Sequence, residues 1–388
     1  MKVIILAAAL AAVAGGAQAA DELKLGLMLS KSGAAGLVGE EMQKGFDLAM
    51  ADHGGKLGGV AVKVFSEDDK SDPAVAVQLA SKFTDEDHVE IMTGFLGSNT
   101  TIPVVPTLLE SGVWIVGALS GPQEFAGKDC KANAFFASFE NEDWDDALAE
   151  HLNSEHLRSV YFMGADYQAG WEKIGGAMKF YKGKAIGPVY TPWMGQVDLA
   201  PQISEVRAAD PEAIFVFLPG GAGIAFLKQF AQAGLHGKIK IYSEDTIATD
   251  LTFKAEGDAA LGVIQSTSWS YELDNPANKK FVDEFKAKYG RRPTIFSALQ
   301  YDAVNLIDSA VAAVHGDLSN KDAFRAALKK ADFQSVRGPF KFDNNHYPIQ
   351  NIYLTEVVKD PDGSMRLALR GTAATDWHDV YHEQCPMK

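Results

Sequence analysis

Small hydroxyl and glycine residues follow two apolar stretches that have the composition of β-strands. The first stretch ends in Gly94-Phe-Leu-Gly-Ser98-Asn-Thr-Thr, and the second, 113–119, ends at Leu119 and continues as Ser120-Gly121. A strand that ends in such residues and opens a helix presents hydroxyls and backbone N–H groups to an anion such as a carboxylate. No nucleophile, base or metal ligand of recognisable spacing accompanies them. The pattern indicates a site that binds a molecule rather than transforms it.

A glycine-rich segment, Gly220-Gly221-Ala222-Gly223, also follows a strand-like run and opens a helix. It approaches the dinucleotide fingerprint G-x-G-x-x-G, but Phe226 stands where the third glycine would allow close packing of strand and helix. We therefore interpret the segment as a second backbone-lined wall of a cleft and not as a nucleotide site.

Acidic residues end two further strand-like runs, as Asp166-Tyr167 and Glu244-Asp245. Carboxylates at strand ends commonly cap turns, but they could also meet a ligand ammonium or hydroxyl group. A pair of carboxylates would also allow the acid and base chemistry of a glycosidase, although the sequence does not define their separation. For these carboxylates the sequence is compatible with turn capping, with ligand binding and with acid and base chemistry.

Two histidines near the C-terminus, His378 and His382, lie four residues apart among several acidic residues. On one helical face they could bind zinc, but there is no H-E-x-x-H motif and no third histidine close in the sequence. We favour a solvated acidic tail over a metal site, and we expect no metal and no cofactor.

The N-terminus reads as a targeting segment. Met1-Lys2 is followed by about a dozen apolar residues, too few to span a membrane, and then by Ala17-Gln18-Ala19, an A-x-A cleavage site. We expect residues 1–19 to be a secretory signal and the mature chain to have no membrane anchor. The expected location is the periplasm of a Gram-negative bacterium.

The net charge and the cysteine content narrow the range of possible partners and compartments. The 388-residue chain has a formal net charge of −15, which argues against nucleic acid and anionic membranes as partners. Its two cysteines, Cys130 and Cys385, predict one disulfide in an oxidising compartment. That bond would tie the C-terminal tail to the body of the protein.

Strand-like and helical patterns alternate along most of the chain, which predicts an α/β fold with mostly parallel sheets covered by helices. Two series of such units, before and after about residue 139, indicate two similar lobes. The last third completes both lobes, so that the chain crosses between them several times. We expect one lobe from 20–138 plus about 268–341, and the other from 139–267 plus about 342–388.

An ordered series of motifs runs along the chain: Leu29-Ser-Lys-Ser-Gly33, Gly39, Gly45, Gly58-Gly59, Asp68-Asp69, Ser71-Asp-Pro73, Gly94-x-x-Gly-Ser98, Tyr301-Asp302-Ala303 and Gly338-Pro339. In this series the chain resembles the type I periplasmic binding proteins, and within them the leucine/isoleucine/valine-binding proteins of ABC importers. The resemblance covers essentially the whole mature chain. It implies two Rossmann-like lobes joined by three crossovers, a ligand trapped in the cleft, an ABC permease as partner, a monomer and no enzymatic activity.

The family's binding positions can be carried over to this chain. Ser98 and the main chain at Leu119 and Gly121 would hold a ligand carboxylate, and Tyr167 would come from the second lobe. The remaining expected contacts are an acid for an α-ammonium group and two residues that line the pocket: Asp245, Val38 and Phe296. Asp245 is one methylene shorter than the family's usual glutamate, and Val38 replaces a frequent aromatic residue.

One stretch is similar to a subgroup that binds benzoate-like aromatic acids: Arg337-Gly-Pro-Phe-Lys-Phe342 and then His346-Tyr-Pro-Ile-Gln350, together with the cysteine pair. Small residues at Val38 and Gly221 would leave room for a flat ring. We therefore expect a small aromatic acid as ligand, with a branched-chain amino acid as the alternative. A secreted hydrolase and a ligand sensor are more remote alternatives.

Overall fold

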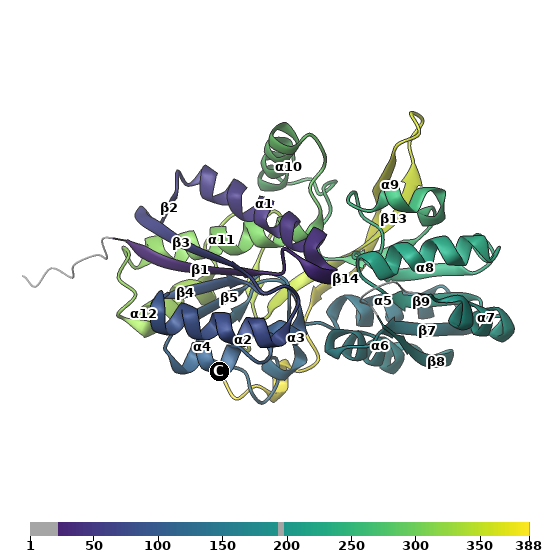
Figure 1. Cartoon of the computed structure of the whole chain (residues 1–388), viewed down its shortest axis with the longest axis horizontal. Coiled ribbons are helices and arrows are strands. Elements are labelled where there is room, and N and C mark those ends of the chain that lie inside the picture. Colours follow the sequence, from purple (N-terminus) through teal and green to yellow (C-terminus); the bar gives the residue numbers. More distant parts are fainter. Residues whose placement is uncertain (1–21, 193–197, 388) are drawn as a thin grey trace, which may run out of the picture.

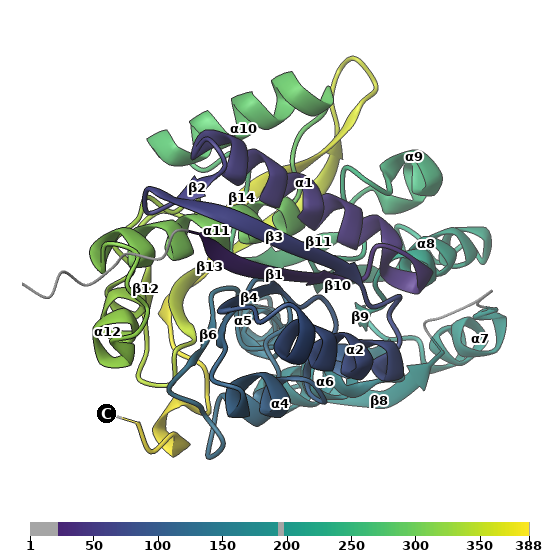
Figure 2. The ribbon, with the colours of Figure 1, turned by 60° about the vertical axis from the view of Figure 1, so that its left-hand side comes forward.

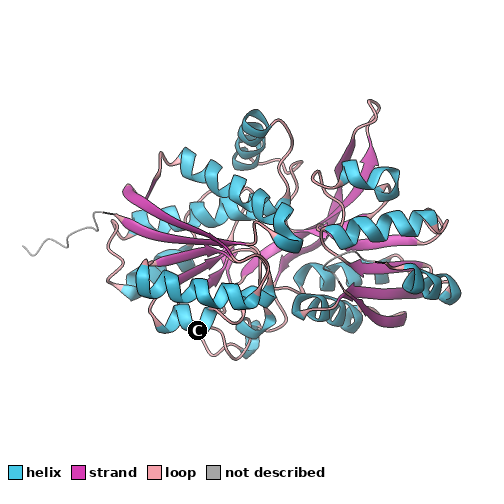
Figure 3. Ribbon diagram, in the orientation of Figure 1, coloured by secondary structure: helices cyan, strands magenta, loops and turns pink. Residues whose placement is uncertain are grey.

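The computed structural model describes residues 22–192 and 198–387, and it confirms an α/β protein of two lobes (Figures 1 and 3). Each lobe contains one sheet with helices on both faces. The predicted signal segment lies outside the described residues. Within the described ranges, no helix is both long and apolar enough to cross a membrane.

The first lobe contains a six-stranded sheet of order β2-β3-β1-β4-β5-β6. Its strands are β1 (Leu23–Leu29), β2 (Lys56–Leu57), β3 (Val60–Asp68), β4 (Ile91–Gly94), β5 (Trp114–Gly117) and β6 (Ala134–Phe136). All neighbours pair in parallel except the β2–β3 hairpin. The helices of this lobe are α1 (Gly36–Asp52), α2 (Pro73–Ser81), α3 (Ser98–Thr101), α4 (Val105–Glu110), α10 (Pro276–Tyr289), α11 (Ile295–Ala313) and α12 (Lys321–Lys330). Figures 1 and 2 show α1 and α11 on one face of the sheet and α2 and α4 on the other.

The second sheet has the order β12-β13-β11-β10-β9-β7-β8, with β14 paired to β13. Its strands are β7 (Ser159–Ala165), β8 (Lys184–Thr191), β9 (Ala213–Phe217), β10 (Lys240–Glu244), β11 (Ile264–Thr267), β12 (Lys341–Phe342), β13 (Pro348–Lys359) and β14 (Met365–Trp377). The helices around it are α5 (Asp143–Ser154), α6 (Gln168–Phe180), α7 (Ala200–Ala209), α8 (Gly221–Gln232) and α9 (Phe253–Glu256). Short helical turns are η1 (Gly33–Ala35), η2 (Lys82–Glu86), η3 (Gln123–Phe125), η4 (Gly257–Ala260) and η5 (His382–Gln384).

The chain passes between the lobes between β6 and α5, between β11 and α10, and from α12 through β12 into β13, and the segment after β14 returns to the first lobe. Each lobe has its own apolar core. One core joins β1 and β4 to α1 and α11, and the other joins β7, β9 and β10 to α6 and α8. This arrangement places the ends of both sheets beside the crossing segments, where a cleft between the lobes can form.

The C-terminal tail contacts the first lobe, although the sequence analysis assigned it to the second. The predicted disulfide is present between Cys130, which follows η3, and Cys385, which follows η5. The turn between β12 and β13 is held on the same lobe, because the hydroxyl of Tyr347 donates to the carbonyl of Pro122 and the side-chain amide of Asn345 to that of Ala126, both at 2.9 Å. The amide of Asn345 also donates to Asp379 of the tail at 2.8 Å. The tail is therefore fixed to the first lobe although β13 and β14 belong to the second sheet.

Candidate functional site

A cavity of about 80 Å³ lies between the two lobes. The first lobe contributes Val38, Leu96, Ser98, Leu119, Ser120 and Phe296, and the second contributes Tyr167, Lys173, Phe217, Gly220, Glu244 and Thr246. Phe139 and Asn141, from the first crossing segment, complete the wall. Because both lobes and a crossing segment line the cavity, a bound molecule would contact all three.

Two neighbouring strands bring Ser98 and Ser120 to the same end of the first sheet. Strands β4 and β5 pair in parallel with Gly94 opposite Gly117, so the segments that follow them emerge side by side. Gly94 has φ of +99°, and a Cβ there would lie 2.3 Å from the carbonyl oxygen of Met28, so only glycine fits this turn. The hydroxyls of Ser98 and Ser120 lie 3.2 Å apart and both are buried.

Asn141 connects the two serines to the second lobe. Its side-chain amide donates to the hydroxyl of Ser98 at 2.9 Å and to the carboxylate of Glu172 on α6 at 2.6 Å. Since Ser98 already accepts this bond, its own proton is available to Ser120 or to a ligand oxygen. The cavity therefore has a polar end built from two hydroxyls and one amide.

The polar end differs in one respect from the expected site. Helix α3, which begins at Ser98, is only four residues long and supplies little helix dipole. The backbone N–H of Gly121 is not free either, because it donates to the side-chain oxygen of Asn141 at 3.1 Å. The hydroxyl groups of Ser98 and Ser120 are therefore side-chain donors at this end of the cavity, whereas the N–H of Gly121 is already paired.

Apolar and aromatic side chains form most of the remaining wall. The rings of Phe139, Phe217 and Phe296 line the cavity together with the aliphatic side chains of Val38 and Leu119. Tyr167, at the start of α6, lies on the same wall with its ring centroid 6.2 Å from that of Phe217. Burial raises the pKa of the Tyr167 phenol, so it stays protonated at neutral pH. Such a wall suits an apolar ligand body.

Lys173, on α6, is a cavity residue that sequence reasoning missed. Its buried ammonium group donates to Glu244 at 2.5 Å and to the carbonyl of Asn141 at 2.7 Å, and lies 3.4 Å from Asp145. Burial lowers the pKa of Lys173, but the carboxylates of Glu244 and Asp145 outweigh burial, and the pKa lies above its usual value. Lys173 is therefore charged, and it sits 5.0 Å from the ring centroid of Phe139.

The structure places three of the expected site residues outside the lining of this cavity: Gly121, Gly221 and Asp245. Gly221 begins α8, and its neighbour Gly220 lines the cavity instead. Asp245 points to a separate small cavity that Asp250 also lines, and burial raises the pKa of Asp245 well above its ordinary value. The other six expected residues, Val38, Ser98, Leu119, Ser120, Tyr167 and Phe296, line the cavity together.

Five carboxyl groups of the first crossing segment and the start of α5 are buried behind the cavity: Glu140, Glu142, Asp143, Asp145 and Asp146. Burial raises the pKa of each of them. For Asp146, burial and the neighbouring carboxyl groups raise the pKa to about 9. With a pKa of about 9, Asp146 holds a proton at neutral pH.

These groups predict a pH-dependent stability. A carboxyl group with a raised pKa binds its proton more tightly in the folded chain, so its stabilisation is complete below the unfolded pKa and is lost as the pH rises through the folded pKa. For Asp146 that window runs from 3.8 to about 9. In urea titrations, Asp146→Asn should raise the free energy of unfolding at pH 8 by on the order of 2 kcal/mol and change it little at pH 4.

The control for this experiment is Asp332→Asn, because the side chain of Asp332 is 72% exposed and the substitution should leave the pH profile unchanged. Parallel pH profiles for the wild type and Asp146→Asn would contradict the assignment of a strongly raised pKa to Asp146.

The sequence matches the model of a family described as periplasmic binding protein over residues 22–363. A curated relative from Brucella melitensis, named Leu/Ile/Val-binding protein homolog 6, is 27% identical, and the match covers 94% of each chain. A solute-binding protein of an ABC transporter from Rhodopseudomonas palustris, solved in complex with benzoate, is 28% identical with a TM-score of 0.88, covering 94% of this chain and 100% of that one. A second, from R. palustris BisB5 in complex with 3,4-dihydroxy benzoic acid, is 25% identical with a TM-score of 0.83, covering 92% and 99%.

Proposed function

The chain belongs to the periplasmic binding protein family, and on this premise we propose that it is the solute-binding component of an ABC importer for a small aromatic acid of the benzoate class. The protein would act in the periplasm as a monomer without a cofactor. It would enclose one ligand between its lobes and deliver it to the permease.

The polar end of the cavity would hold the ligand carboxylate. Ser98 and Ser120 offer two hydroxyl protons there, and hydrogen bonds to a charged carboxylate are stronger than those between neutral groups. Water is excluded when the lobes close, which further strengthens these bonds. The opposite walls, formed by Phe139, Phe217 and Phe296, would pack against the ring.

The observation that carries this proposal is the ion pair between Lys173 and Glu244. Glu244 is the one acidic residue among the described residues that line the cavity, and its carboxylate already accepts a bond from Lys173. An amino acid would need an acidic partner for its ammonium group and would also lie beside the positive charge of Lys173. Because Asp245 lies outside the lining, a carboxylate without an ammonium group is the favoured ligand.

Likeness to proteins of known ligand supports the same choice. The solved relatives at 28% and 25% identity are complexes with benzoate and 3,4-dihydroxy benzoic acid. The curated relative at 27% identity is named as a Leu/Ile/Val-binding protein homolog, which favours a branched-chain amino acid as the second candidate. The Lys173–Glu244 ion pair favours the aromatic acid over the branched-chain amino acid.

Binding energy would do two things in this mechanism. Hydrogen bonds to the ligand select its chemistry, and contacts from both lobes favour the closed arrangement over the open one. The closed shape is then what the permease recognises. Asn141 would contribute both to ligand selection and to closure, since it contacts Ser98 in the first lobe and Glu172 in the second.

A thermal-shift screen tests the proposed ligand class. The mature protein is unfolded, dialysed to remove any bound ligand, refolded, and heated with benzoate, 4-hydroxybenzoate, leucine, valine or glutamate. A ligand at 100 times its dissociation constant adds about 2.7 kcal/mol of stability and raises the melting temperature. We expect the shift with the aromatic acids; a shift with leucine or valine alone would overturn the proposal.

The two remaining alternatives, a hydrolase and a ligand sensor, predict different results. A hydrolase would convert its ligand, so chromatography of the recovered compound would show a product. A sensor would bind the ligand without any stimulation of a permease. We expect the recovered aromatic acid to be chemically unchanged.

A further inference from the structure

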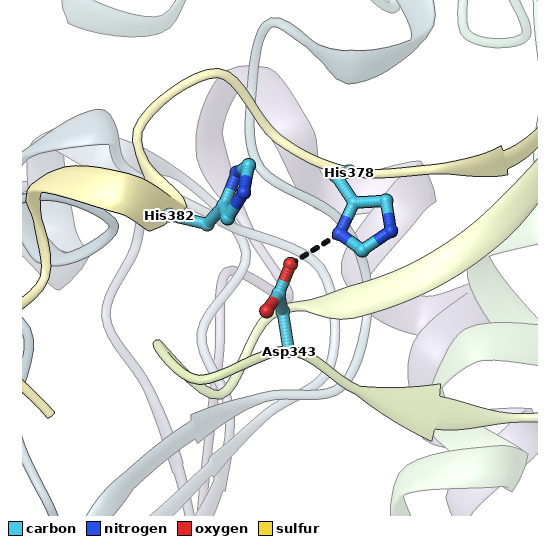
Figure 4. A group of neighbouring side chains, drawn as sticks. All are labelled: Asp343, His378 and His382. Atoms are coloured by element: carbon cyan, nitrogen blue, oxygen red, sulfur yellow. Dashed lines mark hydrogen bonds and ion pairs between the residues drawn. The ribbon is translucent and has the colours of Figure 1, made fainter. Parts of the chain in front are cut away.

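Three side chains able to bind a metal ion meet beside the C-terminal tail, away from the residues that line the cavity. They are Asp343, His378 and His382, and one ligand atom from each lies within 4.8 Å of the other two (Figure 4). Asp343 follows β12, His378 follows β14, and His382 begins η5. The two histidines are therefore not on one helical face, as their spacing suggested, and the third group comes from a distant part of the sequence.

Hydrogen bonding prepares one histidine for coordination. The Nδ1 atom of His382 lies 2.5 Å from the carbonyl oxygen of Asp379. Because a carbonyl only accepts hydrogen bonds, Nδ1 carries the proton and Nε2 keeps its lone pair. A backbone carbonyl on the second ring nitrogen is the usual outer partner of a metal-binding histidine.

The other two groups already contact each other. Nδ1 of His378 lies 2.5 Å from a carboxylate oxygen of Asp343, as Figure 4 shows. The side chain of His378 is 45% exposed and that of Asp343 is 14% exposed. An ion can therefore reach the pair from solvent and insert between Nδ1 and the carboxylate, with the imidazole proton moving to Nε2.

The surrounding tail is held in place. The side-chain amide of Asn344 donates to the carbonyls of His382, Cys385 and Met387 at 3.0, 3.4 and 3.2 Å. The disulfide from Cys385 to Cys130 anchors the same segment to the first lobe. The backbone that carries His382 is thus fixed next to Asp343, which lowers the entropic cost of forming a site.

We propose that Asp343, His378 and His382 bind one divalent transition-metal ion, with zinc as the reference ion and water completing its coordination. Two imidazoles and one carboxylate are a known zinc ligand set. Ligands of a tetrahedral zinc ion lie about 3.4 Å apart, which small side-chain rotations can reach from the observed arrangement. The proposal does not depend on which solute the cavity binds.

Calorimetric titration with zinc chloride tests the proposal on the full mature chain, with its disulfide intact and any histidine tag removed. We expect one zinc ion per chain and a higher melting temperature that EDTA reverses. Removing one of three ligands in His382→Ala should raise the dissociation constant at least about tenfold. His378→Gln, at an exposed position, should do the same without affecting the fold.

The matched control is His315→Asn, which removes another exposed histidine. Asparagine is chosen because His315 has φ of +52°, a conformation that asparagine tolerates. The control should bind zinc like the wild type. Absence of stoichiometric zinc binding, or equal dissociation constants for the wild type, His382→Ala and His378→Gln, would overturn the proposal.

Discussion

Replacing both Ser98 and Ser120 by alanine is expected to weaken the binding of benzoate by on the order of 100-fold, or about 3 kcal/mol. Each hydroxyl would donate a hydrogen bond to the ligand carboxylate, and such bonds to a charged group are worth about 1.5–3 kcal/mol. The two hydroxyls lie 3.2 Å apart and are hydrogen-bonded to each other, so we expect the double variant to lose less than the sum of the single variants.

Calorimetric dissociation constants for the two single variants and the double variant measure this effect. Ser138→Ala is the matched control, because Ser138 is equally buried but is not among the cavity-lining residues. It should bind benzoate like the wild type. If the double variant also kept wild-type affinity, the carboxylate would have to bind elsewhere in the cavity.

Replacing Arg337 by methionine is expected to lower the free energy of unfolding by about 3–5 kcal/mol, because it leaves a buried carboxylate without its cation. Arg337 and Asp302 are both buried, with Nε of Arg337 3.0 Å from a carboxylate oxygen of Asp302. Burial lowers the pKa of Arg337 and raises that of Asp302, and the charge of each partner opposes the shift of the other.

The guanidinium group of Arg337 also joins three segments of the chain. It donates to the carbonyls of Ala137 and Ser138 in the first crossing segment, at 2.6 and 3.0 Å, and to the side chain of Gln350 on β13 at 3.2 Å. Since Asp302 lies on α11, one side chain connects two crossings to the first lobe. Its loss should therefore weaken the contacts between the crossing segments as well as the packing of the first lobe.

Urea unfolding followed by tryptophan fluorescence gives the change in free energy. The double variant Arg337→Met/Asp302→Leu should recover part of the loss, because both charges are then absent. Lys330→Met is the control: its partner Asp332 is exposed, so the change should stay within about 1 kcal/mol. A loss below about 1 kcal/mol for Arg337→Met would contradict the account of this pair.

Most of the fold could be predicted because strong local patterns coincide with the elements. Strand β7 is a continuous apolar run, helix α10 begins at Pro276 after its cap Asn275, and Pro103 separates α3 from α4. Strand β8 is hard to recognise because Thr191 is its one buried residue, which removes the apolar pattern. The stretch 337–342 forms a strand only at Lys341–Phe342, since Arg337 is buried and Gly338 has φ of +96°.

The site could be predicted only where local chemistry determines it. Ser98 and Ser120 follow adjacent strands, and that relation is visible in the sequence. Lys173 is different: on a helix it reads as a solvent-exposed lysine, and its buried charge is balanced by Glu244 and Asp145, which are 71 and 28 residues away. Asn141 and Asp343 were missed for the same reason, because their partners are brought together by tertiary packing alone.

Calorimetric titration of the refolded, ligand-free chain with benzoate, and in parallel with leucine, is the most direct test of whether the cavity binds an aromatic acid. We expect saturable binding of one benzoate per chain, recovery of benzoate unchanged, and no measurable heat from leucine. Saturable binding of leucine with none of benzoate would contradict it. That result would mean that the Lys173–Glu244 pair opens to receive an ammonium group.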